Sequence, residues 1–201
     1  MNTIKQAALE KVLSRLSKAT NYNLSLEQYD TPPRLAAALL YRAAQEGNVI
    51  GKSVADLGCG NGIFAIGSAV LGASKVYGVE KDREMITIAR KNCEEIGVDV
   101  ELLQTDVSDF SIEVDTMFMN PPFGIHKRGI DVPFVDIALK LSKHFYIILD
   151  YNAGDFLRNH VKQKATLSWE EMSFIEIPHS YDFHRKEEVK VPVRIARVDV
   201  W

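Results

Sequence analysis

The run Asn120-Pro121-Pro122-Phe123-Gly124 combines residue types that suit chemistry on an exocyclic amino group. The side-chain oxygen of Asn120 and the backbone carbonyl of Pro121 can each accept one N–H from such a group. The two prolines hold both acceptors rigidly, because the proline ring fixes the backbone φ angle. With both hydrogens held, the nitrogen lone pair is localised and can attack an electrophile. Phe123 offers a flat face on which a base can stack.

A second run, Asp56 to Gly62, has alternating glycines at Gly58, Gly60 and Gly62. Glycines at this spacing let the backbone turn tightly and approach a ligand that a side chain would obstruct. A dinucleotide-binding loop needs the pattern G-x-G-x-x-G, which would place its third glycine at Ile63. The spacing therefore argues against a nicotinamide dinucleotide.

Two acidic residues follow later strands of the predicted sheet. Glu80 ends the second strand, where a carboxylate can accept hydrogen bonds from both hydroxyls of a ribose. Asp106 follows the third strand, where it can accept a bond from an adenine amino group. A tight turn alone explains the glycine run but not these two acids. Together the three features predict an adenosine site without a phosphate cradle.

These residues need a sheet whose strands end beside them. After Gly51, short apolar runs alternate with helical segments, a pattern typical of a parallel sheet with crossover helices. The predicted strands lie at 53–57, 75–79, 99–103, 114–119 and 144–149. The predicted helices lie at 62–72, 82–96, 132–142 and 153–164.

Both ends of the chain add elements to this core. Apolar residues at helical spacing predict a leading helix over 4–16, and Pro32 and Pro33 open a second helix. Segments around Phe174 and over 189–200 predict a closing hairpin. We therefore expect an α/β fold with a doubly wound, mostly parallel seven-stranded sheet, N-terminal helices and a C-terminal antiparallel hairpin. Such a sheet binds ligands beyond the carboxyl ends of its strands, which the motifs follow.

Composition limits the class of protein. The 201 residues are 46% hydrophobic and 25% charged, close to a soluble globular average, and predict one domain over 1–201. The net charge of -3 gives no global attraction to phosphate polymers, so any nucleic-acid contact must be a local patch. No apolar run approaches the ~20 residues that span a bilayer, and no signal-peptide core is visible, so we expect a cytoplasmic protein. Cys59 and Cys93 cannot form a zinc site alone, and we expect buried thiols and no metal.

The motifs resemble those of a known enzyme class. The glycine run, Glu80 and Asp106 resemble the ligand motifs of class I S-adenosylmethionine-dependent methyltransferases. The loop at Asn120 resembles the [DNS]-P-P-[YFW] motif of methyltransferases that act on adenine N6, guanine N2 or glutamine N5. Residues 27–32, Glu-Gln-Tyr-Asp-Thr-Pro, resemble the Glu-Gln-Tyr-x-Thr-Pro motif of adenine N6 methyltransferases.

From end to end the chain is similar to the methyltransferase-like family that places N6-methyladenosine on small-subunit ribosomal RNA in archaea and eukaryotes. This resemblance implies S-adenosylmethionine as the cofactor, with residues 1–50 as a helical segment that includes its cap. The cofactor residues that it implies are Gln28, Thr31, Asp56, Gly58, Gly60, Asn61, Ile63, Glu80, Asp106 and Val107. The catalytic residues would be Asn120, Pro121, Pro122 and Phe123. RNA would contact Tyr29, His126, Lys127, Arg128, Phe183, His184, Arg185 and Lys186, which mix aromatic rings with cations.

The resemblance also implies a partner, a small zinc-containing activator protein that pairs with an edge strand. Addition at an edge strand is physically plausible, because such a strand presents unpaired backbone donors and acceptors. One departure from the family follows the fifth strand, where Asp150-Tyr151-Asn152 stands in place of the His-Lys of some relatives. The acidic residue argues against a phosphate grip by this loop.

Other functions fit parts of the pattern. A guanine N2 RNA methyltransferase also uses Asn-Pro-Pro-Phe, but the Gln28-Tyr29 pair speaks against it. A protein glutamine N5 methyltransferase usually has tyrosine in place of Phe123. A protein that only binds S-adenosylmethionine would not need an intact Asn120 loop. The same residues would suit an extruded deoxyadenosine, so the choice of RNA over DNA rests on the family resemblance.

Overall fold

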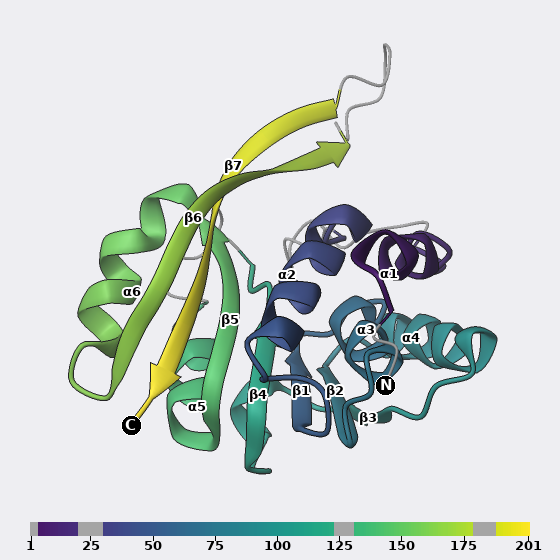
Figure 1. The fold of residues 1–201 in the computed structure, drawn as a ribbon, viewed down its shortest axis with the longest axis horizontal. Helices are drawn as coiled ribbons and strands as arrows, with labels where there is room; N and C mark the ends of the chain where they lie inside the picture. The colour runs from purple at the N-terminus through teal and green to yellow at the C-terminus, as the bar shows by residue number, and fades with distance from the viewer. Residues whose placement is uncertain (1–3, 20–29, 123–130, 179–187) are drawn as a thin grey trace.

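The computed structural model describes residues 4–19, 30–122, 131–178 and 188–201. They form a seven-stranded sheet in the order β3-β2-β1-β4-β5-β7-β6 (Figure 1). Its strands are β1 (Ser53–Leu57), β2 (Lys75–Glu80), β3 (Glu101–Gln104), β4 (Val114–Met119), β5 (Ser142–Asp150), β6 (Ala165–Pro178) and β7 (Glu188–Val200). Strands β1 to β5 are parallel, and β7 is antiparallel to both β5 and β6. The predicted fold class is confirmed.

The strand order reverses at β1, which has β2 on one side and β4 on the other. Leu57 pairs with Val79 of β2 and with Met119 of β4, so the three strands end together. A sheet with this order leaves a crevice beyond its carboxyl ends, where ligands of doubly wound sheets bind. The glycine run, Glu80 and Asn120 lie at or directly beyond these ends, which we call the carboxyl edge.

Helices cover both faces of the sheet. They are α1 (Gln6–Leu13), α2 (Pro33–Gln45), α3 (Ile63–Val70), α4 (Arg83–Ile96), α5 (Val132–Leu141) and α6 (Gly154–Val161), with short 3-10 helices η2 (Val107–Asp109) and η3 (Tyr151–Ala153). One hydrophobic cluster joins α1 to α4 to one face, and a second joins α5 and α6 to the other. Side chains of β4 alternate between them, with Phe118 in the first and Met117 and Met119 in the second. Among the helices described, none is long and apolar enough to cross a membrane.

The closing hairpin differs from the prediction in its length. We expected a strand around Phe174, whereas β6 has 14 residues. Charged residues such as Glu170 interrupt the apolar alternation, because β6 is the edge strand of the sheet and one side of it meets solvent. Smaller differences occur elsewhere: α1 is shorter than the predicted 4–16, α6 is shorter than the predicted 153–164, the third strand starts at Glu101, and β5 extends past the predicted 144–149 at both ends.

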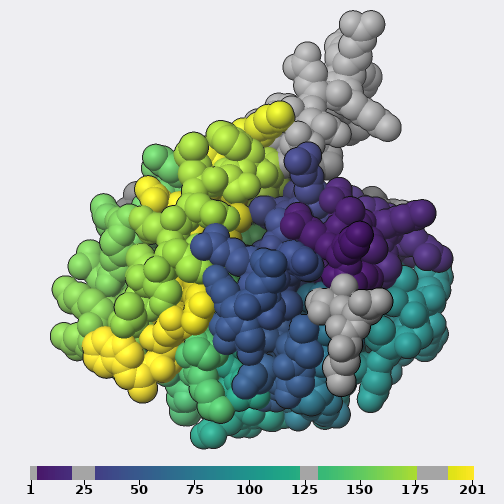
Figure 2. Space-filling model, viewed as in Figure 1, coloured from purple at the N-terminus to yellow at the C-terminus, as the bar shows by residue number. Residues whose placement is uncertain are grey.

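The hairpin also extends past the carboxyl edge. Asp150, the last residue of β5, pairs with Val193, and residues 188–192 of β7 continue beyond that pair along β6. Figure 1 shows the hairpin curving past the end of β5 and above α2. In the space-filling view, α2 lies between the hairpin on one side and α1 on the other (Figure 2). The carboxyl edge is therefore flanked by extended backbone on its β5 side.

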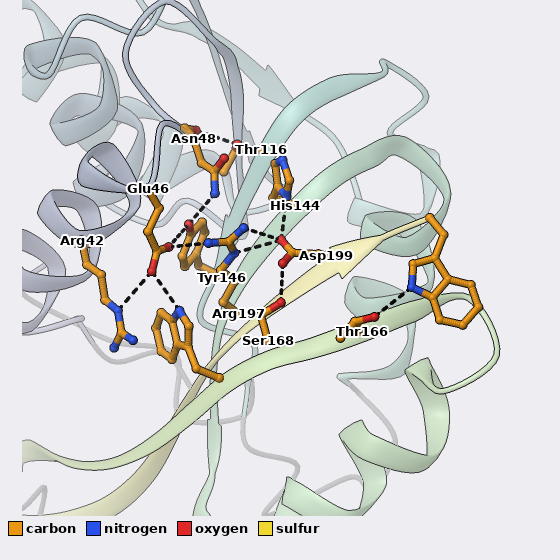
Figure 3. A network of polar contacts seen from close by, with 12 residues as sticks. Arg42, Glu46, Asn48, Thr116, His144, Tyr146, Thr166, Ser168, Arg197 and Asp199 are labelled. Carbon is orange, nitrogen blue, oxygen red and sulfur yellow. Dashed lines mark hydrogen bonds and ion pairs between the residues drawn. The ribbon is translucent and has the colours of Figure 1, made fainter.

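One carboxylate holds the end of α2 against the sheet. Glu46 accepts hydrogen bonds from the Tyr146 hydroxyl on β5 at 2.6 Å and from Trp169 Nε1 on β6 at 3.0 Å. Arg42 of α2 and Arg197 of β7 form ion pairs with Glu46 at 3.3 and 3.1 Å (Figure 3). Burial, together with the hydrogen bond to Glu46, raises the pKa of Tyr146 above its ordinary value, so the phenol remains a donor. This network attaches the C-terminal end of α2 to β5, β6 and β7.

Candidate active site

The glycine run forms a surface of backbone at the carboxyl edge. Gly58, Gly60 and Gly62 have φ angles of 69°, 54° and 88°, a region that residues with side chains rarely adopt. The N–H of Gly58 donates to the carbonyl of Val79 at 2.8 Å, which ties the loop to β2. A Cβ on Gly58 would lie 3.1 Å from Cε1 of Phe134 on α5. The glycines therefore let the backbone of the loop come close to a ligand, while the N–H groups of Gly58, Gly60 and Gly62 are bonded within the protein.

Asp56 supports this loop from beneath. Its side chain is buried, and Oδ2 accepts a hydrogen bond from the N–H of Ala65 in α3 at 2.9 Å. Burial raises the pKa of Asp56 to about 7, and the nearby charge of Glu80 acts in the same direction, while backbone hydrogen bonds lower it. The carboxylate that we expected at the cofactor thus anchors the first turn of α3, below the glycines.

Glu80 ends β2 and turns toward the glycine run. Its Oε2 accepts from the N–H of Gly60 at 3.1 Å, and its Oε1 accepts from the N–H of Asp82 at 3.0 Å. These two bonds fix the plane of the carboxylate. Each oxygen of a carboxylate can accept about two hydrogen bonds, so the group keeps the capacity to accept from a vicinal diol.

Asp106 and Val107 follow β3 at the same edge. Asp106 is exposed, and its Oδ1 accepts from the N–H and the hydroxyl of Ser108 at 3.0 and 2.7 Å, which caps η2. The hydrogen bond from the Ser108 N–H is the main cause that lowers the pKa of Asp106, so the carboxylate is ionised. Val107 is buried and belongs to the core beneath it.

Asn61 and Ile63 lie in the loop with their side chains turned into the protein. Ile63 is 5% exposed and belongs to the hydrophobic cluster of α1 to α4. Asn61 is also 5% exposed, and its Nδ2 donates to the carbonyl of Ser17 at 3.4 Å. Contact between these two residues and a ligand would therefore involve their backbone.

The acceptor loop follows β4, beside the glycine run. Asn120 donates from Nδ2 to the hydroxyl oxygen of Thr31 at 3.0 Å, and Thr31 is buried just before α2. This bond orients the amide with its nitrogen toward Thr31 and makes Oδ1 the acceptor. Pro121 is buried and Pro122 is half-buried, which fixes the loop directly after the amide.

Several predicted site residues lie outside the described residues. They are Gln28, Tyr29, Phe123, His126, Lys127, Arg128, Phe183, His184, Arg185 and Lys186.

Sequence reasoning missed Asn92. This residue is 0% exposed in α4 and bonds to the backbone of the glycine run at Asn61 and to Ser17. One signal could have found it, because Asn92 is a lone polar residue on the buried side of its helix, beside Ala89 and Cys93.

Arg194 was also missed. Its guanidinium lies 4.6 Å from the ring centre of Tyr151, and Nε donates to the Tyr151 carbonyl at 2.6 Å. A Cβ on Gly154 would lie 2.6 Å from Arg194 Nε, so the glycine makes room for this side chain. β7 thereby brings a cation to the loop after β5, where the sequence showed only Asp150, and the same guanidinium also forms an ion pair with Glu170 of β6 at 3.4 Å.

The set of groups at the carboxyl edge suits a nucleoside. Glu80 supplies acceptors for a diol, Asp106 supplies one for an amino group, and the glycine run supplies close backbone. Two carboxylates would repel a phosphate but not a nucleoside with a positively charged substituent. The residues therefore fit a cationic adenosine cofactor placed beside the acceptor Asn120.

Comparison with known proteins gives matches over almost the whole chain. The family model described as methyltransferase small domain matches residues 30–140. The uncharacterized protein MJ0284 of Methanocaldococcus jannaschii is 36% identical over 98% of this chain and 94% of its own. The rRNA N(6)-adenosine-methyltransferase METTL5 of Danio rerio is 34% identical over 96% of this chain and 98% of its own. The solved structure of PH1948 from Pyrococcus horikoshii has a TM-score of 0.90, with 34% identity and 98% coverage of both chains.

Proposed function

The chain belongs to the methyltransferase small-domain family, and we propose that it methylates the N6 amino group of an adenosine in small-subunit ribosomal RNA. The observation that carries the proposal is the Asn120 amide, which Thr31 orients beside the glycine run and Glu80. An oriented acceptor next to an adenosine-cofactor site suits methyl transfer to an amino group. Relatives from Danio rerio and Drosophila melanogaster that are named rRNA N(6)-adenosine-methyltransferases support adenine N6 and ribosomal RNA. An rRNA substrate also supports a cytoplasmic location.

The cofactor is S-adenosylmethionine, which supplies a methyl group on a sulfonium that a nucleophile can take. In the proposed complex, Glu80 accepts bonds from both ribose hydroxyls and Asp106 accepts from the adenine amino group. The backbone of the glycine run lies against the methionine part. In the proposal, Thr31 and Gln28 would close the site from the N-terminal side.

The acceptor loop would prepare the substrate amino group. The Oδ1 atom of Asn120 and the carbonyl of Pro121 each accept one N–H, which localises the nitrogen lone pair and directs it at the methyl donor. Phe123 would stack on the adenine. The amino proton leaves to water after the transfer, so no base with a shifted pKa is needed. Holding the two reacting groups in line supplies most of the rate.

RNA would approach along the hairpin side of the carboxyl edge. Residues 188–192 of β7 continue past the end of β5, and Arg194 and Tyr151 add a cation and a ring at that end. In the proposal Tyr29, together with the segments 126–128 and 183–186, supplies further aromatic and cationic contacts. Exposed rings and cations are the usual groups that bind unpaired RNA.

We also propose that a small zinc-containing activator protein pairs with an edge strand. β3 is an edge of the described sheet, and partly buried apolar residues border it, among them Val98, Val100, Leu102 and Leu103. A partner strand on β3 would cover these side chains and pair the open backbone edge. A purified protein that is stable, monomeric and fully active alone would contradict this part of the proposal.

The experiment that tests the function is methyl transfer from labelled S-adenosylmethionine to unmodified small-subunit ribosomal RNA, with and without the activator. Mass spectrometry of the digested RNA identifies the modified nucleoside. We expect N6-methyladenosine. N2-methylguanosine would assign the protein to the guanine class, and the absence of any product with the activator present would contradict the proposal.

Matched variants make this assay specific. Asn120→Ala should abolish the product, because it removes the acceptor that faces the amino group. Asn159→Ala changes the same residue type on the exposed surface of α6 and should retain full activity. Equal activity of the two variants would exclude the role proposed for Asn120.

A further inference from the structure

Asn92 is a buried side chain whose amide is fully used in bonds to other segments. Its Oδ1 accepts from the N–H of Ser17 at 2.8 Å, and its Nδ2 donates to the carbonyl of Ser17 at 3.1 Å. Nδ2 also donates to the carbonyl of Asn61, in the glycine run, at 2.9 Å. One amide thus holds two chain segments that are 44 residues apart.

Ser17 is bound from the glycine run as well, because Asn61 Nδ2 lies 3.4 Å from its carbonyl. The neighbours Leu16 and Ala19 are 6% and 8% exposed, so the segment around Ser17 is packed into the protein. The stretch after α1 is therefore fastened to the loop that faces the cofactor site.

The same stretch leads to the acceptor loop. Lys18 forms an ion pair with Asp30 at 3.7 Å, and Asp30 directly precedes Thr31, the hydrogen-bond partner of Asn120. We call Ser17, Lys18, Asp30 and Thr31 the N-terminal clasp. A series of contacts runs from the glycine run through the clasp to Asn120.

The contacts in this series differ in strength. The Lys18 side chain is 58% exposed, and exposed ion pairs contribute little. Loss of the Asn92 amide would leave the part-buried N–H of Ser17 and the buried carbonyl of Asn61 without this partner, which is more costly. Asn92 is therefore the anchor of the clasp.

We infer that Asn92 is a positioning residue that holds the N-terminal clasp against the glycine run, so that the cofactor loop and the Thr31–Asn120 pair keep one geometry. This inference rests on the proposed function, because the glycine run must bind the cofactor. Asn92 is itself 0% exposed and acts through Asn61 and Ser17. Only an amide supplies both the acceptor and the two donors that this position uses.

Titration calorimetry with S-adenosylmethionine tests the inference. Asn92→Ala and Asn92→Asp should weaken binding about tenfold at a temperature where both variants are folded. Thr116→Val removes another fully buried hydrogen bond, from Oγ1 to the Asn48 carbonyl at 2.6 Å, and should bind within about twofold of the wild type. Unchanged affinity in the folded Asn92 variants overturns the inference. Wild-type protein that does not bind S-adenosylmethionine overturns the proposed function, and this inference with it.

A double-variant cycle tests the coupling to the acceptor side. If the clasp acts as a unit, the double variant Asn92→Ala/Thr31→Val should bind the cofactor with an affinity within about twofold of that of the single variant that binds it more weakly. If the factors by which the two substitutions weaken cofactor binding multiply in the double variant, Ser17 and Thr31 act separately, and the coupling is overturned.

Hydrogen exchange tests the inference on the wild-type protein alone, so it does not depend on the folding of a variant. Saturating S-adenosylmethionine should slow exchange of the Ser17 amide at least about tenfold, because the ligand would stabilise the clasped state. The amide of Trp201, which donates to the Lys164 carbonyl at the far end of the hairpin, serves as the control and should not change. An unchanged Ser17 amide overturns the inference.

Discussion

Asn120 donates a hydrogen bond from Nδ2 to the hydroxyl oxygen of Thr31, 3.0 Å away and 89 positions earlier in the sequence. Thr31 is 5% exposed and precedes α2, whose other end is held to the sheet by Glu46. The bond decides which atom of the amide serves as the acceptor. Thr31, which precedes the glycine run in the sequence, and Asn120, which follows it, therefore form one acceptor together.

Thr31→Val should slow methyl transfer about tenfold, because the isosteric side chain cannot accept the Asn120 bond and the amide loses its orientation. Thr31→Ser keeps the hydroxyl and should retain most of the rate. Single-turnover assays at saturating S-adenosylmethionine measure the effect. Valine and serine variants with the same rate would show that the bond has no role in transfer.

Glu80→Gln should weaken S-adenosylmethionine binding about tenfold, because one acceptor oxygen becomes a donor that cannot satisfy both the loop N–H groups and a ribose diol. Glu101→Gln is the control, since Glu101 is an exposed acid of the neighbouring strand that pairs with Lys75. Calorimetry compares the two variants. Equal affinities of both variants and the wild type would remove Glu80 from the ribose.

Asp56 should make folding stability depend on pH. Burial raises its pKa from 3.8 to about 7 in the folded protein, so between about pH 4 and about pH 7 the folded state holds a proton that the unfolded state has lost. Stability from this group therefore falls as pH rises through that window. Asp56→Asn removes the titration, and its free energy of unfolding should fall less steeply than that of the wild type, by up to about 1.4 kcal/mol per pH unit. Urea unfolding across the window checks this, and parallel curves would contradict it.

Gly154→Ala should destabilise the protein by about 1–3 kcal/mol, because the new Cβ would lie 2.6 Å from Arg194 Nε. In an Arg194→Ala background, Gly154→Ala should instead stabilise the protein. Gly154 has ordinary helical angles, φ -58° and ψ -43°, where alanine stabilises a helix by about 0.5–1 kcal/mol. Thermal unfolding of the four proteins gives both values. A loss of stability in both backgrounds would show that Arg194 is not the cause.

The central sheet could be predicted because its signals are local. Apolar runs mark β1, β2, β4 and β5, and the placement of Gly58, Glu80 and Asn120 just at the strand ends follows from the alternation of strand and helix. The length of β6 could not be predicted, because an edge strand with an exposed side does not need continuous apolar alternation.

The contacts that complete the site could not be predicted for a different reason. Asn92 meets Ser17 across 75 positions, and Arg194 meets Tyr151 across 43. Such pairs depend on how α4 packs and on the register between β5 and β7, which a single sequence does not show. The loop after β5 illustrates the consequence, because its acidic sequence argued against a phosphate grip while β7 supplies it with a cation.

The most direct test of the account compares two quantities in Asn120→Ala, the single-turnover rate of methyl transfer and the dissociation constant of S-adenosylmethionine. The rate should fall about 100-fold or more, because the group that holds the reacting amino nitrogen is gone. The dissociation constant should stay within about threefold of the wild type, because the residues that bind the cofactor are unchanged. Equal loss of transfer and of cofactor affinity, or full transfer without the amide, would contradict the assignment of Asn120 as the residue that holds the amino group.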